Sequence, residues 1–341
     1  MASTPQQHPS PQLFFETVNG YQRTAALRTA IELGLFTAIA EGARTAAEIG
    51  KKIGAAERGA RMLADYLTIV GFLKKRGSQY ELTPDSAIFL DRRSPAYLGG
   101  TLQFLIGPGI MDAWAGLTEA VRKGGTVQAD QGSVAPENPM WVDFARSMAP
   151  MMMPNAQAIA QILRVAEGKP LKVLDIAAGH GIFGITIAQA NPKAEIYAVD
   201  WKPVLAVAAE NAQKMGVAAR HHLIPGDAFA VEFGKDYDVA LVTNFLHHFD
   251  PPTNEKLLQK VHAALKPGGR VAILEFVPED DRVSPAMAAG FSMIMLAGTP
   301  AGDAYTYKEL DRMCRNAGFS VQASSIHPLD PLPETVVVAT K

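Results

Sequence analysis

The sequence predicts an α/β protein in which a mostly parallel sheet, covered by helices, follows a smaller helical domain. Three observations predict it. After the breaker Gly168-Lys169-Pro170, apolar runs of strand length alternate with segments of helix length. Before residue 98, three helical patterns lead into two short alternating runs around a Gly-Ser turn. The length of 341 residues favours two domains over one.

The second half of the chain carries the sheet. Its predicted strands span 171–176, 195–200, 222–225, 237–243 and 270–275. Helices are predicted between them over 182–190, 204–215 and 254–265. Strands that are apolar throughout and joined by helices are typical of a parallel sheet with both faces covered. Two final runs, 319–326 and 335–339, predict a closing hairpin-like pair.

The first half is predicted to be helical. A helical pattern over 25–33 stops at Gly34, and a capping-box pattern from Thr45 to Glu48 opens a second helix. A third helix over 57–70 precedes a hairpin over 72–83, which completes the outline of a winged helix. We therefore predict a flexible arm at 1–12, a winged-helix-like domain at 13–98, a helical linker at 99–165 and the sheet domain at 166–341.

A winged helix raises the alternative of a DNA-binding regulator. In the third predicted helix, however, two arginines are balanced by Glu57 and Asp65, which is weak for contacts with phosphates. The net charge of −2 gives no overall attraction to nucleic acid or to an anionic membrane. We therefore expect neither partner.

The cysteine content and the N-terminus bear on the compartment. Cys314 is the only cysteine, so no internal disulfide and no cysteine-based zinc site can form. Residues 1–12 are polar and proline-rich, without an apolar signal segment. No stretch reaches the ~18 apolar residues that a membrane helix needs. We expect a cytoplasmic protein.

A glycine loop follows the first strand of the sheet. Its run from Gly179 to Gly184 matches G-x-G-x-x-G between a strand and a helix. By itself this motif fits a dinucleotide, or a tight turn that binds nothing. The strand before the loop carries Asp175, whose charge would repel a diphosphate and attract an ammonium group. Asp175 therefore favours a ligand that joins an amino acid to a nucleoside over NAD.

Side chains at the ends of the next strands agree with that ligand. Asp200 ends the second strand, where it can accept both ribose hydroxyls, and Trp201 beside it can cover the adenine face. The run Gly226-Asp227-Ala228-Phe229 follows the third strand, where its carboxylate can accept from the adenine amino group. Asn244 ends the fourth strand. Ligands of open α/β sheets bind at these carboxyl ends.

Four motifs also carry a resemblance to a known family. They are Val173-Leu-Asp-Ile-Ala-Ala-Gly-His-Gly181, Gly226-Asp-Ala-Phe229, Leu246-His-His-Phe249 and Leu265-Lys-Pro-Gly-Gly-Arg270. In their order and spacing the chain resembles, over nearly its whole length, the class I small-molecule O-methyltransferases of the plant caffeate and bacterial antibiotic-tailoring type. The resemblance implies a Rossmann-like domain with a seven-stranded, mostly parallel sheet, and an N-terminal winged-helix dimerisation domain. It also implies a homodimer, S-adenosylmethionine as methyl donor on Gly179 and Gly181, and S-adenosylhomocysteine as product.

The resemblance assigns catalytic roles as well. It implies that His247 is the general base, and that Glu275 and Glu309 are the acids flanking it. His248 stands where the family often has aspartate, which leaves its effect on the acceptor open. Glu309 also completes a capping box with Thr306, so it could instead only close a helix N-terminus.

The resemblance implies an acceptor pocket lined by Phe144, Met148, Met295, Thr299 and His248. Without it, methionine and phenylalanine at helical spacing would be interpreted as core residues. Thr299 stands where plant members have asparagine, so polar recognition differs here. A metal-dependent catechol methyltransferase would need clustered oxygen ligands. Because the nearest acidic pair, Asp280-Asp281, lies in a loop and precedes an arginine, we predict no metal.

The acidity of the hydroxyl group limits the chemical class of the methyl acceptor. A phenol with a pKa of about 10 is ionised to roughly one part in a thousand at pH 7. A general base contributes ~10²–10⁴-fold and closes much of that gap, whereas an aliphatic alcohol leaves a far larger one. We therefore predict methylation of a phenolic or enolic hydroxyl of an aromatic small molecule. The alternative is a member with divergent chemistry, such as a hydroxylase, decarboxylase or pericyclase.

Overall fold

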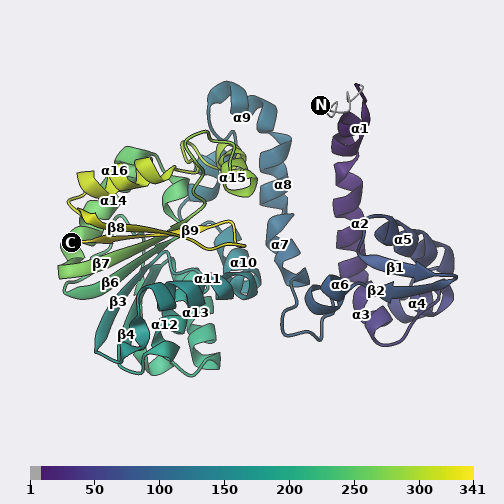
Figure 1. Cartoon of the computed structure of the whole chain (residues 1–341), viewed down its shortest axis with the longest axis horizontal. Helices are drawn as coiled ribbons and strands as arrows, with labels where there is room; N and C mark the ends of the chain where they lie inside the picture. Colours follow the sequence, from purple (N-terminus) through teal and green to yellow (C-terminus); the bar gives the residue numbers. More distant parts are fainter. Residues whose placement is uncertain (1–8) are drawn as a thin grey trace, which may run out of the picture. The chain divides into compact units, whose positions relative to one another are not determined.

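The computed structural model describes residues 9–341, except the side chains of residue 167 and residues 321–324. Of the flexible arm predicted over 1–12, residues 1–8 lie outside the described residues, and the first helix begins at Gln12. The chain forms two compact units, one ending at Leu102 and the other running from Gln103 to Lys341 (Figure 1). Each unit has its own apolar core.

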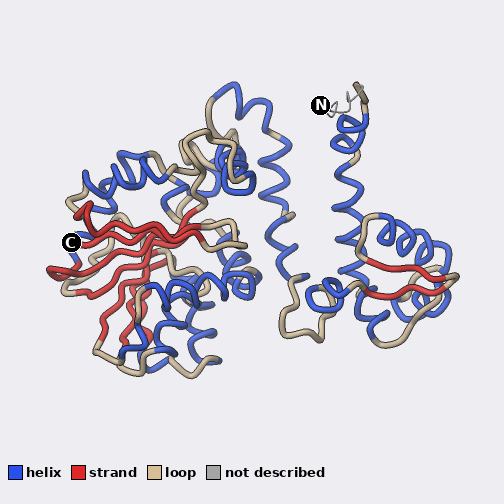
Figure 2. Tube along the Cα trace, in the orientation of Figure 1, coloured by secondary structure: helices blue, strands red, loops and turns tan. Residues whose placement is uncertain are grey.

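The first unit combines helices with a two-stranded antiparallel hairpin (Figure 2). Its elements are α1 (Gln12–Val18), α2 (Gly20–Leu33), α3 (Leu35–Ala40), α4 (Ala46–Ile53), α5 (Glu57–Ile69), β1 (Leu73–Arg76), β2 (Gln79–Leu82), α6 (Pro84–Phe89) and the 3₁₀ helix η1 (Gly99–Thr101). The predicted helices and hairpin are confirmed. Gly34, at a left-handed φ of 73°, ends α2, and the Thr45–Glu48 capping box opens α4.

Asp65 is the centre of a polar cluster on α5. Asp65 on this helix accepts hydrogen bonds from Arg61, from Lys75 on β1 and from the buried Tyr80 on β2. These contacts tie the helix to the hairpin. They also leave α5 with a balanced face rather than a basic one.

The second unit is built on a seven-stranded sheet of order β5-β4-β3-β6-β7-β9-β8. Its strands are β3 (Leu171–Ile176), β4 (Ala194–Asp200), β5 (His221–Pro225), β6 (Tyr237–Thr243), β7 (Leu265–Glu275), β8 (Ser320–Pro328) and β9 (Thr335–Thr340). Strands β3 to β7 are parallel, and β9 pairs antiparallel with both β7 and β8. The predicted seven-stranded sheet with its closing pair is confirmed.

Helices cover both faces of this sheet (Figure 1). One face packs on α11 (Ala149–Ile162) and α12 (Ile182–Ala190), and the other on α14 (Pro251–Ala264) and α16 (Tyr307–Asn316). The remaining elements of the unit are α7 (Leu102–Leu105), α8 (Pro108–Ala115), α9 (Leu117–Lys123), η2 (Ala129–Val134), α10 (Met140–Ser147), η3 (Val165–Glu167), α13 (Lys202–Lys214), η4 (Ala218–Arg220), η5 (Leu246–His248) and α15 (Ala286–Gly298). Within residues 9–341 no helix is both long and apolar enough to span a bilayer.

The strand order creates a switch point beside β3. The chain passes from β3 to β4 on one side and returns to β6 on the other. The connections leaving β3 and β6 therefore diverge, and open α/β sheets bind their ligands at the carboxyl ends of strands that flank such a point. The predicted ligand-binding segments all follow strands at this edge.

Candidate active site

The glycine loop, residues 177–181, connects β3 to α12 at the carboxyl edge of the sheet. Its backbone has positive φ at Ala177, Gly179 and Gly181, at 52°, 56° and 74°. A Cβ on Gly181 would lie 3.0 Å from the Cβ of Ala208 on α13, so the close approach of the two elements favours glycine there. The loop is thus a tight turn held against a neighbouring helix.

Asp175 lies beneath this loop and is completely buried. One carboxylate oxygen accepts a hydrogen bond from the N–H of Gly184 on α12, at 3.1 Å. The other, Oδ1, has no hydrogen-bond partner among the described residues. Burial, with a smaller contribution from the charge of Asp200, raises the pKa of Asp175 to about 7. Asp175 therefore anchors the first turn of α12 and keeps one unused acceptor.

Asp200, at the end of β4, is joined directly to the glycine loop. Its Oδ2 accepts from the N–H of Gly179 at 2.8 Å, and its Oδ1 from the N–H of Trp201 at 2.7 Å. Burial raises the pKa of Asp200 to about 6. The Trp201 side chain packs with the small apolar cluster between α10 and α13. The two backbone donors fix the carboxylate and leave lone pairs for further donors.

The segment after β5 is similarly constrained. Gly226 has a φ of 139°, and a Cβ there would lie 2.4 Å from Cγ1 of Val231. Asp227 Oδ1 accepts from the N–H of Phe229 at 2.9 Å, while the adjacent Ala228 is buried in the core. The segment therefore presents its carboxylate from a fixed turn.

Asn244 follows β6 with a strained φ of 52°. Its N–H donates to the carbonyl of Leu274 at 2.8 Å, and its Nδ2 lies 3.7 Å from the sulfur of Met152 on α11. Its Oδ1 is buried and has no partner among the described residues. Asn244 thus resembles Asp175 in holding an unused acceptor at this edge.

His247 and Glu275 form a buried pair at the ends of β6 and β7. Their side chains are 5% and 2% exposed, and His247 Nδ1 lies 2.5 Å from Glu275 Oε2. The other carboxylate oxygen, Oε1, accepts from the N–H groups of Phe245 and Leu246 at 3.0 and 2.8 Å. A carboxylate can only accept, so in the neutral imidazole Nδ1 is the nitrogen that carries the proton, and Nε2 keeps a free lone pair.

His248 lies against its neighbour His247, with ring centroids 4.3 Å apart. Trp141 of α10 meets it edge to face at 5.1 Å. Burial, and to a smaller extent repulsion from the protonated form of His247, lower the pKa of His248 well below its usual value. His248 is therefore a neutral imidazole, and its Nδ1 has no partner among the described residues.

Of the predicted lining residues, Phe144 contacts the glycine loop. Its ring stacks on His180 at 5.8 Å with an interplanar angle of 20°, and meets Trp141 and Phe104 edge-on at 5.7 and 5.1 Å. Met148, at the end of the same helix, is buried in the adjoining core. Phe144 therefore joins α10 to the loop, whereas Met148 packs beneath it.

Met295 and Thr299 lie at the end of α15, and both are buried. The Thr299 hydroxyl donates to the carbonyl of Met295 at 2.7 Å and accepts from the N–H of Gly302 at 2.9 Å. These bonds use the hydroxyl to close the helix and order the turn after it. An acceptor contact by Thr299 stays a prediction, and its hydroxyl is already engaged.

Glu309 occupies the first turn of α16. Its carboxylate accepts from the N–H of Thr306 at 2.9 Å, which completes the capping box. Arg282 binds both of its oxygens at 2.6 Å. No hydrogen bond joins Glu309 to His247 within the described part of the chain. Its role as a flanking acid stays a prediction, and its contacts are those of a helix cap.

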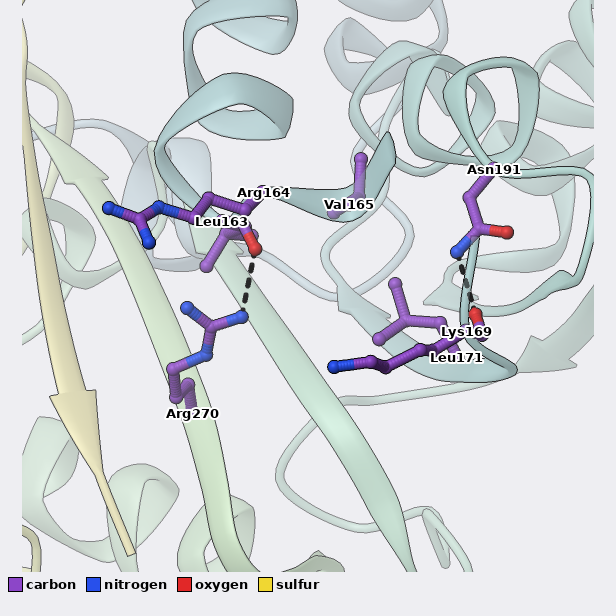
Figure 3. Close-up of a pocket in the computed structure, with 7 residues that line it drawn as sticks. All are labelled: Leu163, Arg164, Val165, Lys169, Leu171, Asn191 and Arg270. Atoms are coloured by element: carbon purple, nitrogen blue, oxygen red, sulfur yellow. Dashed lines mark hydrogen bonds between the residues drawn. The ribbon is translucent and has the colours of Figure 1, made fainter. Parts of the chain in front are cut away.

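A cavity of 310 Å³ lies near the amino end of β3, and Figure 3 shows the residues that line it. It is lined by Leu163, Arg164, Val165, Lys169, Leu171, Asn191 and Arg270. Arg270 donates to the carbonyl of Leu163, and Asn191 to that of Lys169. Because Leu171 is the first residue of β3, this cavity is separate from the glycine loop, which follows the last.

Two family models match this chain and identify the family to which it belongs. A family model described as the O-methyltransferase domain matches residues 143–320, and one described as the O-methyltransferase dimerisation domain matches residues 15–92. The chain belongs to the O-methyltransferase family. It is therefore an enzyme, an S-adenosylmethionine-dependent O-methyltransferase with an N-terminal dimerisation domain.

Relatives of this O-methyltransferase match it over its full length. A crystal structure from Nostoc punctiforme, provisionally described as an O-methyltransferase, is 52% identical, has a TM-score of 0.94 and covers 98% of this chain and 100% of its own. The 3-hydroxy-5-methyl-1-naphthoate 3-O-methyltransferase of Streptomyces sahachiroi is 29% identical over 100% of this chain and 98% of its own. The tetracenomycin polyketide synthesis 8-O-methyltransferase of Streptomyces glaucescens is 28% identical over 99% of each.

Several residues at the site of this O-methyltransferase were not predicted from the sequence. Trp141 and His180 flank Phe144, and Phe291 of α15 meets His247 edge to face at 4.8 Å. His180 carried a signal, because it lies inside the glycine motif. Trp141 and Phe291 had no sequence signal other than their helical spacing. Helical spacing does not distinguish a residue that faces the core from one that lines a pocket. Within residues 9–341, His, Cys, Asp and Glu side chains form no group of three or more placed to hold a metal.

The variant Glu309→Gln separates the two roles of this residue. We expect it to lower the free energy of unfolding by less than about 1 kcal/mol, because the amide oxygen of glutamine still accepts from the N–H of Thr306 and only the charge facing the partly exposed Arg282 is lost, and to leave the pH profile of kcat unchanged. Thr306→Ala is the control, since it removes the capping hydroxyl of the same helix and leaves the acid in place. Denaturant unfolding and pH-dependent kinetics measure both effects. A fall in kcat for Glu309→Gln that Thr306→Ala does not share would make Glu309 a flanking acid.

Proposed function

We propose that this enzyme transfers the methyl group of S-adenosylmethionine to a phenolic or enolic hydroxyl of an aromatic small molecule, with His247 as the general base. The buried His247–Glu275 pair carries the proposal. It lies at the carboxyl edge of the sheet, where the glycine loop also lies. In this proposal the imidazole, rather than a metal ion, takes up the proton of the hydroxyl.

The start of α12 supports a cofactor without a diphosphate at this point. Diphosphate sites use free backbone N–H groups at a helix N-terminus. Here the N–H of Ile182 donates to His180 Nδ1 and that of Gly184 donates to Asp175. Because the chain's own side chains already occupy these donors, and because Asp175 is an acid, a pyrophosphate would find few partners.

The unused acceptors fit the amino-acid end of S-adenosylmethionine. Oδ1 of Asp175 and Oδ1 of Asn244 are buried without partners among the described residues, and an ammonium group would supply donors to such oxygens. In the same proposal Asp200 accepts from the ribose hydroxyls, Trp201 covers the adenine, and Asp227 accepts from its amino group. When bound, the cofactor supplies a methyl group activated on a sulfonium.

Glu275 gives His247 its proposed role. The carboxylate holds the Nδ1 proton and fixes the ring, so Nε2 is the nitrogen that can remove a proton from the acceptor hydroxyl. After proton transfer the same carboxylate stabilises the imidazolium. Its second oxygen binds the backbone of the turn, which keeps the ring in register with the sheet. Glu275 is thus a positioning residue for the base.

The surroundings favour a flat, apolar acceptor. Phe144, Trp141 and His248 form a continuous run of ring contacts from the glycine loop to the base. Phe291 meets His247 from another helix and stacks on Phe276 at 3.9 Å. Aromatic rings pack well against such walls. The naphthoate named for one relative is of this class, which supports an aromatic acceptor here.

The variant Asp200→Asn should weaken binding of S-adenosylhomocysteine at least about tenfold, because it removes a charged acceptor from two ribose hydroxyls.

The affinity for S-adenosylhomocysteine should also depend on pH, because Asp175 and Asp200 are proposed to bind the ligand in their ionised forms. Affinity is therefore full above the pKa values of Asp175 and Asp200, about 7 and about 6, and declines as the pH falls below them. Calorimetry across this range measures both effects.

Asp238→Asn is the control for that experiment. Asp238 also accepts a backbone N–H, from Lys172, but it does so at the amino edge of the sheet. We expect it to bind S-adenosylhomocysteine as the wild type does. Equal losses in the two variants would remove the ribose role from Asp200.

The function is tested directly with methyl-labelled S-adenosylmethionine and a panel of catechols, flavonoids and quinols. We expect a product that has gained one labelled methyl group on oxygen, identified by mass spectrometry. If S-adenosylhomocysteine binds but every acceptor is recovered unmethylated, the proposed reaction fails. A product altered without the label would point to the divergent chemistry of a hydroxylase, decarboxylase or pericyclase.

We also propose that the enzyme is a homodimer formed through the N-terminal unit. Its α1 has no buried residue, although it is rich in apolar side chains. Phe14, Phe15 and Val18 are 63%, 56% and 54% exposed in the single chain. A contiguous apolar surface of this kind marks an interaction site, and the matched dimerisation family indicates a second copy as its partner.

A further inference from the structure

The imidazole of His180 stands out within the glycine loop because half of its hydrogen-bonding capacity is unused. It is 1% exposed and lies between Phe144, on which it stacks, and Phe183, whose ring centroid is 5.7 Å away. The carbonyl of the same residue accepts from Asn211 on α13 at 2.9 Å. Both the backbone and the ring plane of His180 are therefore fixed.

The contacts determine which nitrogen of His180 carries the proton. The N–H of Ile182 donates to Nδ1 at 3.2 Å, so Nδ1 must be unprotonated. Burial lowers the pKa of His180 to about 4, so the ring is neutral near pH 7 and its one proton lies on Nε2. Nε2 has no hydrogen-bond partner among the described residues. The loop thus holds a buried donor that lacks an acceptor.

We propose that the Nε2–H of His180 binds the carboxylate of the methionine moiety of S-adenosylmethionine. This inference rests on the proposed function. An amino acid presents an ammonium and a carboxylate on one carbon, so its site needs acceptors and a donor close together. The acceptors are Asp175 Oδ1 and Asn244 Oδ1 at the ends of β3 and β6. His180, in the loop that leaves β3, is the matching donor.

His180 also touches a residue predicted to line the acceptor pocket. Because its ring stacks on Phe144, the same N–H could instead meet an oxygen of the methyl acceptor. The cofactor and the methyl acceptor are thus two possible partners of this N–H, and they differ in one group, since only the cofactor carries the α-carboxylate. A ligand that lacks this carboxylate therefore distinguishes them.

The experiment compares S-adenosylmethionine with decarboxylated S-adenosylmethionine, which keeps the sulfonium and the ammonium. Calorimetry gives the Kd of each for the full-length wild type and for His180→Phe, which keeps a ring to stack on Phe144 but has no donor. We expect His180→Phe to weaken S-adenosylmethionine about 10- to 100-fold, the range for a hydrogen bond to a charged group. We expect the Kd of the decarboxylated ligand to change less than about twofold, since the lost contact is absent from it.

His221→Phe is the matched control. His221 is also buried with both ring nitrogens lacking partners among the described residues, but it begins β5 at the amino edge of the sheet. We expect this variant to bind both ligands like the wild type. Equal weakening of both ligands by His180→Phe, or the same loss in His221→Phe, would overturn the proposal. So would unchanged S-adenosylmethionine binding with a raised KM for the acceptor, which would assign the donor to the acceptor.

A second measurement needs no variant to fold. In wild-type protein labelled with ¹⁵N-histidine, the Nε2–H signal of His180 should shift with S-adenosylmethionine and much less with the decarboxylated ligand. A response that is the same for both ligands contradicts the carboxylate contact. If the wild type binds neither ligand, the proposed function itself fails. If the wild type binds both ligands and His180 responds equally to each, only the proposed contact between His180 and the carboxylate fails.

Discussion

Replacing His247 with alanine is expected to lower kcat for a phenolic acceptor by at least about a hundredfold, while the Kd for S-adenosylhomocysteine changes less than about twofold. A general base contributes ~10²–10⁴-fold when the acceptor is un-ionised. The alanine removes the base but leaves Glu275 bound to the N–H groups of Phe245 and Leu246, so the turn is kept. Steady-state kinetics and calorimetry measure the two quantities separately.

A series of acceptors makes the test of His247 stricter. A base helps least when the hydroxyl is already ionised, so the loss should shrink as the pKa of the acceptor falls toward the assay pH. His248→Ala is the comparison variant, because His248 is adjacent and buried and belongs to the proposed acceptor wall, but its ring lies against Trp141 instead of Glu275; any loss that it causes should therefore not depend on the acidity of the acceptor. Turnover of His247→Ala close to the wild type, or a loss that ignores the acidity of the acceptor, would show that His247 is not the base.

Local sequence signals predicted the sheet domain well. The strand over 171–176 and the helix over 182–190 are found with the predicted bounds, because an apolar run and a glycine turn specify these elements almost alone. The capping box at Thr45 is a second case, since both of its partners lie within one turn. Such elements depend on neighbours in sequence, which a single chain reveals.

Contacts between distant elements could not be predicted in the same way. The capping-box pattern indicated that Glu309 lies at a helix N-terminus, but it did not reveal that Arg282, from the loop before α15, pairs with Glu309. The pairing of His247 with Glu275 was expected only from the family resemblance. The wall formed by Trp141 depends on how α10 packs, and no pattern within α10 specifies that packing.

Replacing Glu275 with glutamine should be almost as damaging as removing His247, for a different reason. The Oε1 position accepts from backbone N–H groups, so the amide oxygen should take it and the NH₂ group should face His247 Nδ1. An NH₂ group can only donate, so Nδ1 must give up its proton and Nε2 must carry it. The base then has the wrong tautomer, and we expect kcat to fall at least about a hundredfold and as much as about 10⁴-fold.

Stability distinguishes this effect from a collapse of the site. Glutamine keeps an acceptor for the turn, so Glu275→Gln should unfold near the wild-type midpoint, whereas Glu275→Ala leaves the buried N–H groups unpaired and should lose about 2–5 kcal/mol. Glu334→Gln is the matched control, because Glu334 is a buried acid that immediately precedes the neighbouring strand β9 and binds Asn155. If Glu275→Gln and Glu334→Gln lost the same activity, burial of a charge rather than the tautomer of His247 would be the cause. A large loss confined to Glu275→Gln, with the fold intact, would tie catalysis to the proton that Glu275 holds on Nδ1.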